Sequence, residues 1–127
     1  VHMMSIFGNS LLVSEKSLDY LWKKQSVTAG NLANVDTPGY KAKYVTFEDL
    51  YRAKLEGASG DRAAIKQAAD TAVWQVEESE TETARMDGNN VVADAEFGEL
   101  TKSALQYQFV IQSVNSDIAR LNSVIKG

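Results

Sequence analysis

The chain has 127 residues, a net charge of −4 at neutral pH and no cysteine. This length fits one structural domain. The acidic balance argues against a nucleic-acid binder, which would carry a basic patch. Without cysteine there are no disulfides, thiolate zinc sites or cysteine nucleophiles. The longest apolar runs are three or four residues, which is too short for a membrane span.

The only histidine, His2, stands in a Val-His-Met start that is typical of a cloning remnant, so residues 1–3 are set aside. Without it, Ser-His-Asp triads and histidine zinc sites are excluded. A carboxylate-only enzyme stays open on this ground, but Asp and Glu are scattered and no pair is marked out by apolar surroundings. We predict a protein that is not an enzyme, with no catalytic residue, cofactor or metal ligand. We also expect no cleaved secretory signal, because no charged segment followed by an apolar one opens the chain.

Residues 4–36 are predicted to form a long N-terminal helix. Its apolar residues recur at spacings of three, four and seven, which is helical periodicity. Gly30 costs about 1 kcal/mol relative to alanine, so we expect a weaker last turn. The apolar residues are Phe7, Leu11, Leu18, Leu21, Trp22, Ala29 and Leu32.

Residues 37–93 are predicted to form a turn and a small middle region. Pro38 disfavours a helical conformation at Thr37, and Pro-Gly suits the two central positions of a type II turn, so a tight bend is expected at Thr37–Tyr40. The other expected elements are a short helix capped by Thr46 and carrying Phe47, Leu50, Tyr51 and Leu55, a second short helix at 61–70, a strand at 73–76, a solvated acidic loop at 77–82 and a turn at 87–90. The turn at 87–90 lacks the ligand spacing of a calcium loop.

Residues 94–127 are predicted to form a heptad helix with Asp94 as its N-cap. Apolar residues follow one another there at alternating spacings of four and three, which is the pattern of a coiled-coil seam. The a positions are Ala104, Ile111, Ile118 and Ile125, and the d positions are Leu100, Tyr107, Val114 and Leu121.

The length of this helix predicts an elongated molecule. From 96 to 126 it would be about 46 Å long, whereas a compact ball of this chain length is roughly 36 Å across. We therefore predict a mainly α fold in which two long terminal helices form a coiled-coil-like pair or an assembly layer, with an irregular middle region of short helices and minor β structure. The e and g positions are mostly uncharged, and Val110 and Val124 widen the apolar face. Both an intramolecular hairpin and packing between chains remain open.

The segment 31–41 reads Asn-Leu-Ala-Asn-Val-Asp-Thr-Pro-Gly-Tyr-Lys. It resembles the signature that ends the N-terminal helix of bacterial flagellar rod and hook proteins. The segment 85–91, the following Glu96 and the heptad helix resemble the B-type proximal rod subunits, with the C-type subunit as the alternative. Carried over, the signature residues are Asn31, Ala33, Asn34, Thr37, Pro38, Gly39 and Tyr40.

The resemblance implies a structural subunit of the flagellar basal-body rod that transmits torque and lines the export channel through its terminal helices. It implies export by the flagellar type III apparatus into the periplasmic rod. The implied partners are other rod proteins, a rod-ring adaptor of the FliE type, the export gate and further copies of the chain, with no nucleic acid, small-molecule substrate or membrane span. The rival interpretations are a small secreted helical adaptor or effector, and a cell-wall enzyme, which would need an acidic pair that the sequence does not mark.

Overall fold

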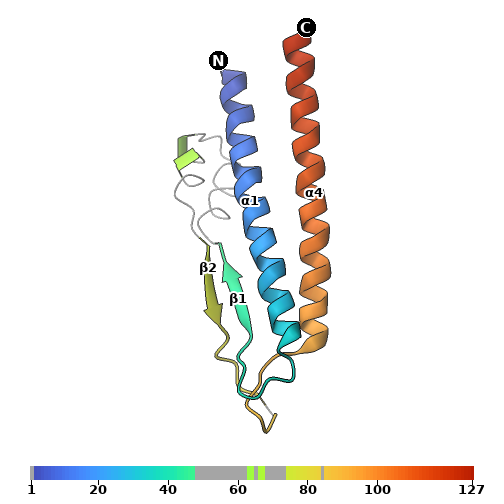
Figure 1. Ribbon diagram of the computed structural model, residues 1–127. Coiled ribbons are helices and arrows are strands. Elements are labelled where there is room, and N and C mark those ends of the chain that lie inside the picture. Colours follow the sequence, from blue (N-terminus) through green and yellow to red (C-terminus); the bar gives the residue numbers. More distant parts are fainter. Residues whose placement is uncertain (1, 48–62, 65, 68–73, 84) are drawn as a thin grey trace.

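The computed structural model describes residues 2–47, 63–64, 66–67, 74–83 and 85–127. Its two long helices, α1 (His2–Ala33) and α4 (Ala93–Lys126), contain 32 and 34 residues, so they are about 48 and 51 Å long. They lie side by side and antiparallel, with both chain termini at the same end (Figure 1). This elongated, mainly helical architecture with a small sheet confirms the predicted fold class.

A two-stranded antiparallel sheet packs on α1. Strand β1 (Lys43–Thr46) pairs with β2 (Gln75–Glu78), and Val45 lies opposite Val76. Figure 1 shows the sheet on the opposite side of α1 from α4, so α1 is the central layer. Val45 is the buried residue of β1, which places the apolar face of this strand towards α1.

The predicted middle region needs one correction, and one of its elements is not described by the structure. The expected strand at 73–76 is β2, but β2 runs to Glu78, so Glu77 and Glu78 pair in a strand instead of lying in a loop. The reason is cross-strand pairing, since Tyr44 and Lys43 face these two carboxylates. Thr46 ends β1, and the short helix that it was expected to cap lies outside the described residues beyond Phe47.

The N-cap of α4 is Val92, and its side chain makes no capping hydrogen bond, so the assignment of Asp94 was wrong. Asp94 and Glu96 instead lie in the first turn of the helix. Their negative charges there face the positive end of the helix dipole, which stabilises the helix without a side-chain cap.

The buried interior is small and partly polar. Its apolar residues, among those described, are Val13, Leu21, Val45 and Val91. Thr28, Asn31, Asn89, Ser103 and Asp117 are buried beside them. Two ring contacts attach the middle region to α1: the rings of Tyr20 and Phe47 are 5.1 Å apart, and the Lys23 ammonium lies 5.5 Å from the Trp74 ring.

Candidate functional site

The end of α1 is closed by the predicted turn. The Asn34 side chain donates to the carbonyl of Gly30 at 2.8 Å, and the Thr37 hydroxyl donates to Asn34 Oδ1 at 3.0 Å. The Tyr40 N–H donates to the Thr37 carbonyl at 3.2 Å, which closes a four-residue turn. Gly39 has a φ of 72°, the left-handed value that the third position of a type II turn requires. The sequence prediction of this turn is confirmed.

Asn31 connects three elements at the end of α1. Its side-chain nitrogen donates to the Lys43 carbonyl at 2.8 Å and to Glu96 Oε2 at 3.0 Å. Its side-chain oxygen accepts from the Lys43 N–H at 2.9 Å and from the Tyr40 hydroxyl at 3.4 Å. The residue is only 1% exposed. One asparagine therefore fixes the relative positions of α1, β1 and α4.

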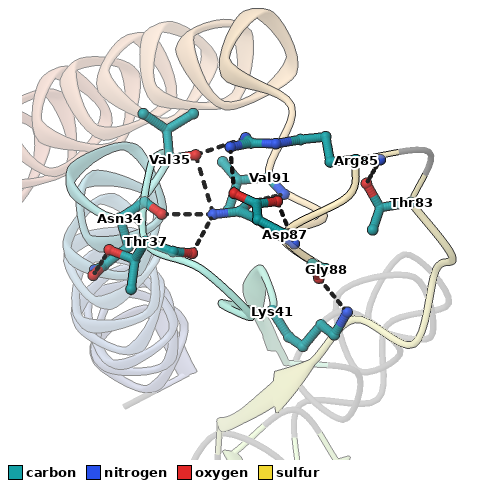
Figure 2. Close-up of polar contacts among 10 residues, drawn as sticks. Asn34, Val35, Thr37, Lys41, Thr83, Arg85, Asp87, Gly88 and Val91 are labelled. Atoms are coloured by element: carbon teal, nitrogen blue, oxygen red, sulfur yellow. Dashed lines mark hydrogen bonds and ion pairs between the residues drawn. The ribbon is translucent and has the colours of Figure 1, made fainter.

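Asn89 ties the loop that precedes α4 to the loop that follows α1. Its side-chain nitrogen donates to the carbonyls of Asn34, Val35 and Thr37 at 2.8, 3.1 and 2.9 Å. Figure 2 shows these three residues around one side of the junction. The Asn89 side-chain oxygen accepts from the Val91 N–H at 2.8 Å. The residue is fully buried. Its amide thus adds a donor to three carbonyls of the turn that follows α1 and holds the two loops together.

Arg85 and Lys41 reinforce the contact between the two loops. Arg85 donates to the Val35 carbonyl at 2.6 Å and pairs with Asp87 at 2.9 Å (Figure 2). Lys41 donates through Nζ to the carbonyl of Gly88, and the Gly39 N–H donates to the Asp87 carbonyl at 2.7 Å. Both glycines have positive φ, and a Cβ on Gly88 would lie 3.7 Å from the Gly39 Cα.

Asn90 completes this network towards the sheet. Its side-chain oxygen accepts from the Ala42 N–H at 2.6 Å, and its nitrogen donates to the carbonyls of Ser79 and Thr81, each at 3.0 Å. We call Asn31, Asn34, Asn89 and Asn90 the asparagine cluster. The cluster binds the exit of α1, the start of α4 and the base of the sheet into one junction.

Of the seven expected signature residues, five make polar contacts in this junction and two are exposed. Asn31, Asn34, Thr37, Gly39 and Tyr40 all make polar contacts within it. Ala33 is the last residue of α1 and is exposed, as is Pro38 on the turn. Asn89 and Asn90 were predicted only as residues of the 87–90 turn, because asparagine is common in turns for its own local hydrogen bonds.

The expected seam residues divide between two sides of α4. The d residues Leu100, Tyr107, Val114 and Leu121 are partly buried. The a residues Ala104, Ile111, Ile118 and Ile125 are exposed, with Ile125 at 69%. Ser103 and Asp117, one position before a, are buried. The face of α4 that meets α1 is therefore built from d and g positions, and the a residues flank it.

Polar pairs hold the two helices in this rotation. The Ser10 hydroxyl donates to Asp117 Oδ2 at 2.6 Å, and Lys24 pairs with Glu99 at 2.9 Å. The hydrogen bond from Ser10, together with Arg120, lowers the pKa of Asp117 below its ordinary value. Lys24 lowers the pKa of Glu99 in the same way. Both carboxylates are therefore charged at neutral pH and favour the paired helices.

The outer surface of the sheet is acidic. A hollow there is lined by Lys41, Tyr44 and residues 77–82. The Tyr44 hydroxyl donates to Glu77 at 2.8 Å, which raises the pKa of Tyr44. No group of three or more acidic, histidine or cysteine side chains arranged to hold a metal occurs among the residues that the structure describes. Within the same residues, neither long helix has a stretch apolar enough to cross a membrane.

Comparison with known proteins agrees with this architecture. The family described as "Flagella basal body rod protein" matches residues 17–41, which cover the second half of α1 and its closing turn. The flagellar basal body rod protein FlgB of Bacillus subtilis (strain 168) is 31% identical over 127 residues, covering 98% of each chain. The chain belongs to the FlgB family.

Other FlgB proteins are similar along nearly the same length. FlgB of Borrelia hermsii is 33% identical over 136 residues, covering 97% of this chain and all of its own. FlgB of Aquifex aeolicus (strain VF5) is 29% identical over 120 residues, covering 89% of this chain and 90% of its own. Membership of the FlgB family places the chain in the flagellar basal body. The family match includes the signature segment 31–41, which contributes Asn31 and Asn34 to the asparagine cluster.

Proposed function

We propose that the chain is a structural subunit of the proximal rod of the flagellar basal body and assembles through its terminal helices. The observation that carries this proposal is the likeness to FlgB proteins over 98% of both chains, which includes α1 and α4. The C-type subunit and the secreted helical adaptor are not favoured, because the relatives described above are all FlgB proteins.

The exposed a residues support assembly through α4. Ile111, Ile118 and Ile125 follow one another every seven residues on a helix 34 residues long, and each is at least 38% exposed. Covering such apolar surface with a neighbouring subunit removes it from water, which favours association. In this proposal the d residues serve the pair within one chain, and the a residues pack against neighbouring subunits.

The asparagine cluster supports a role in transmitting torque. A shaft subunit must not bend where its helices join, and here polar contacts from both loops fix that junction. In this proposal, the signature residues set the angle at which α1 leaves the axis of the rod. Asn31 does this most directly, since it lies on α1 and donates hydrogen bonds to both β1 and α4.

Further details of the role are proposed with it. The terminal helices would line the export channel, and the neighbours would be other rod proteins, the FliE-type adaptor and the export gate. Export through the flagellar type III apparatus agrees with the absence of cysteine, because no disulfide would hold the chain folded during its passage.

Electron microscopy of basal bodies from a strain that lacks this gene tests the proposal. We expect membrane rings without an attached rod, hook or filament, and complete structures after complementation with the wild-type gene. Complementation with Asn122→Ala, a change at an exposed residue of α4, should also restore them. Normal rods in the deletion strain would overturn the proposal and favour the helical adaptor.

A further inference from the structure

The side of α4 that faces away from α1 carries a shallow apolar hollow. It is lined by Phe97, Gly98, Thr101, Lys102, Leu105 and Gln106, all of them exposed. Gly98, Thr101, Lys102 and Leu105 are spaced as i, i+3, i+4 and i+7. This is the spacing of the four residues that form a hole in knobs-into-holes packing. Gly98 forms one corner, and no atom lies within 4 Å of the place where its Cβ would be. The hollow is therefore an enlarged hole, open to a bulky apolar side chain.

The largest apolar side chain of α1 is left in solvent by the single chain. Trp22 is 67% exposed, and it lies on the helix face that also carries the exposed Glu15, Asp19, Ser26 and Ala29. This face is turned away from the residues that α1 buries, such as Leu21 and Thr28. A tryptophan contributes strongly to association when a neighbouring surface covers it.

Trp22 and the hollow lie at the same height along the molecule. Ser10 is level with Asp117, and Lys24 is level with Glu99. Because the helices are antiparallel, Trp22 is level with about residues 101–105 of α4. A second copy shifted sideways, with almost no shift along the axis, would bring its Trp22 to the hollow of the first. Figure 1 shows the side of α4 away from α1 open to such a neighbour.

The charges around the two surfaces are complementary. Lys102 is the charged residue of the hollow. Asp19 lies one turn from Trp22, and Glu15 lies one turn further along the same exposed face. A neighbour seated by its tryptophan would bring Asp19 towards Lys102. Such a pair at the rim of an interface sets register more than affinity, and the Lys102 ammonium adds a cation–π contact to the ring.

We propose that the hollow at Gly98 on α4 receives Trp22 of a second copy of this chain. The proposal deepens the assembly role given above and rests on it. Because knob and hole lie on different faces, every copy offers one of each, and the contact runs head to tail from copy to copy. Such a contact closes into a ring or continues as a helix, which is the symmetry that a shaft requires.

Thiol crosslinking of the purified full-length chain tests this contact. The chain has no cysteine of its own, so Asp19→Cys with Lys102→Cys introduces two defined thiols and leaves Trp22 and Gly98 intact. At millimolar concentration with a short bismaleimide, we expect a ladder of dimers, trimers and larger species. Either single variant should stay largely monomeric, because a head-to-tail contact brings no two identical positions together. The control pair, Asp19→Cys with Tyr44→Cys, places the second thiol on the exposed face of the sheet and should give no ladder.

Substitution of the knob and of the hole then identifies the contact. In the two-cysteine background, Trp22→Ala or Gly98→Leu should reduce the crosslinked fraction roughly 30-fold, the effect of losing a central tryptophan, and Trp22→Phe should restore much of it. Trp22→Ala should fold normally, since the residue is mostly exposed. An absent ladder, or one that Trp22→Ala leaves unchanged, overturns this contact. The basal-body result is separate: missing rods without a ladder would keep the rod function and discard this interface.

Discussion

The junction at the loop end of the molecule and the pair of helices α1 and α4 differ in how many of their groups find partners within one chain. At the loop end, Asn31 uses both polar atoms of its amide in four hydrogen bonds, and the Asn89 amide nitrogen is shared among three carbonyls. In the helix pair, the Ser103 hydroxyl is buried without a hydrogen-bond partner, while Ile118 is 44% exposed. The junction is complete in a single chain, and the helix pair is not.

This difference assigns separate tasks to the two regions. A monomer normally buries its large apolar residues and exposes its polar ones. In α4 this order is partly reversed, because Asp117 is buried and Ile118 beside it is exposed. A helix rich in β-branched residues also depends on packing partners more than on its own propensity. We infer that the junction defines the shape of the subunit, and that α4 keeps its apolar side for neighbours.

The strongest way to separate the two regions is a charge on the exposed apolar side. Ile118→Asp should change the free energy of unfolding of the purified chain by no more than about 1 kcal/mol, because the side chain is half exposed. In a deletion strain it should abolish motility, since an unpaired charge buried at a subunit contact costs several kcal/mol. Swimming assays and microscopy of basal bodies measure this. Asn122→Asp, one turn further along α4, is the control, and a motile Ile118→Asp strain would contradict the assembly role.

The junction should respond in the opposite way, with a direct loss of stability. Asn89→Ala removes three donated hydrogen bonds and leaves the N–H of the buried Val91 without its partner, so we expect a loss of about 3 kcal/mol. Urea unfolding of the purified chain measures this difference. Asn122→Ala should lie within about 0.5 kcal/mol of wild type. Equal midpoints for the two variants would show that Asn89 is not essential to the junction.

Local features of this fold could be predicted from the sequence. The Thr37–Tyr40 turn depends on Pro38 and Gly39, which restrict the backbone whatever surrounds them. The two long helices follow from periodicity over many residues. The N-cap was less predictable, because the start of α4 is set by the loop that Asn89 and Val91 anchor, rather than by a side-chain cap.

Long-range choices could not be predicted in the same way. The rotation of α4 depends on Asp117 meeting Ser10, which is 107 residues away in sequence. Both sides of the heptad stripe are apolar enough to face α1, so periodicity alone does not select one of them. Asn89 was hidden for a related reason. Its three carbonyl partners belong to a loop more than 50 residues earlier, and nothing in its neighbours indicates them.

A smaller change in stability is expected at two glycines, one at a positive φ in the turn and one inside α1. Gly39→Ala places a side chain at a φ of 72°, which costs about 1–2 kcal/mol, although the space around it is open. Gly30→Ala, inside α1 and also with open space, should stabilise the chain by up to about 1 kcal/mol. The same substitution should therefore have opposite signs at the two sites. Thermal unfolding of both variants checks this, and a destabilised Gly30→Ala would show that α1 needs the glycine.

The smallest expected effect is a pH dependence of the free energy of unfolding that comes from Asp117 in the helix pair. Because the pKa of Asp117 is lower in the folded chain than its ordinary value of 3.8, the unfolded chain binds more protons between the two values. The contribution of Asp117 is therefore fully present above pH 3.8, and it is lost as the pH falls through the lower, folded pKa. Asp117→Asn should remove this component, so the stability difference from wild type should narrow on acidification.

Urea unfolding of both proteins, from pH 6 down to the acid limit of folding, measures that difference. Ser10→Ala should weaken the pH-dependent component without removing it, because Arg120 still pairs with the carboxylate. A difference between wild type and Asp117→Asn that stays constant with pH would mean that this carboxylate does not hold the two helices together. The hydrogen bonds of the asparagine cluster among amides and carbonyls do not titrate in this range, so Asn89→Ala should give a loss that is nearly independent of pH. One pH series therefore distinguishes the loss of the Asp117 contact in the helix pair from the loss of the Asn89 contacts in the junction.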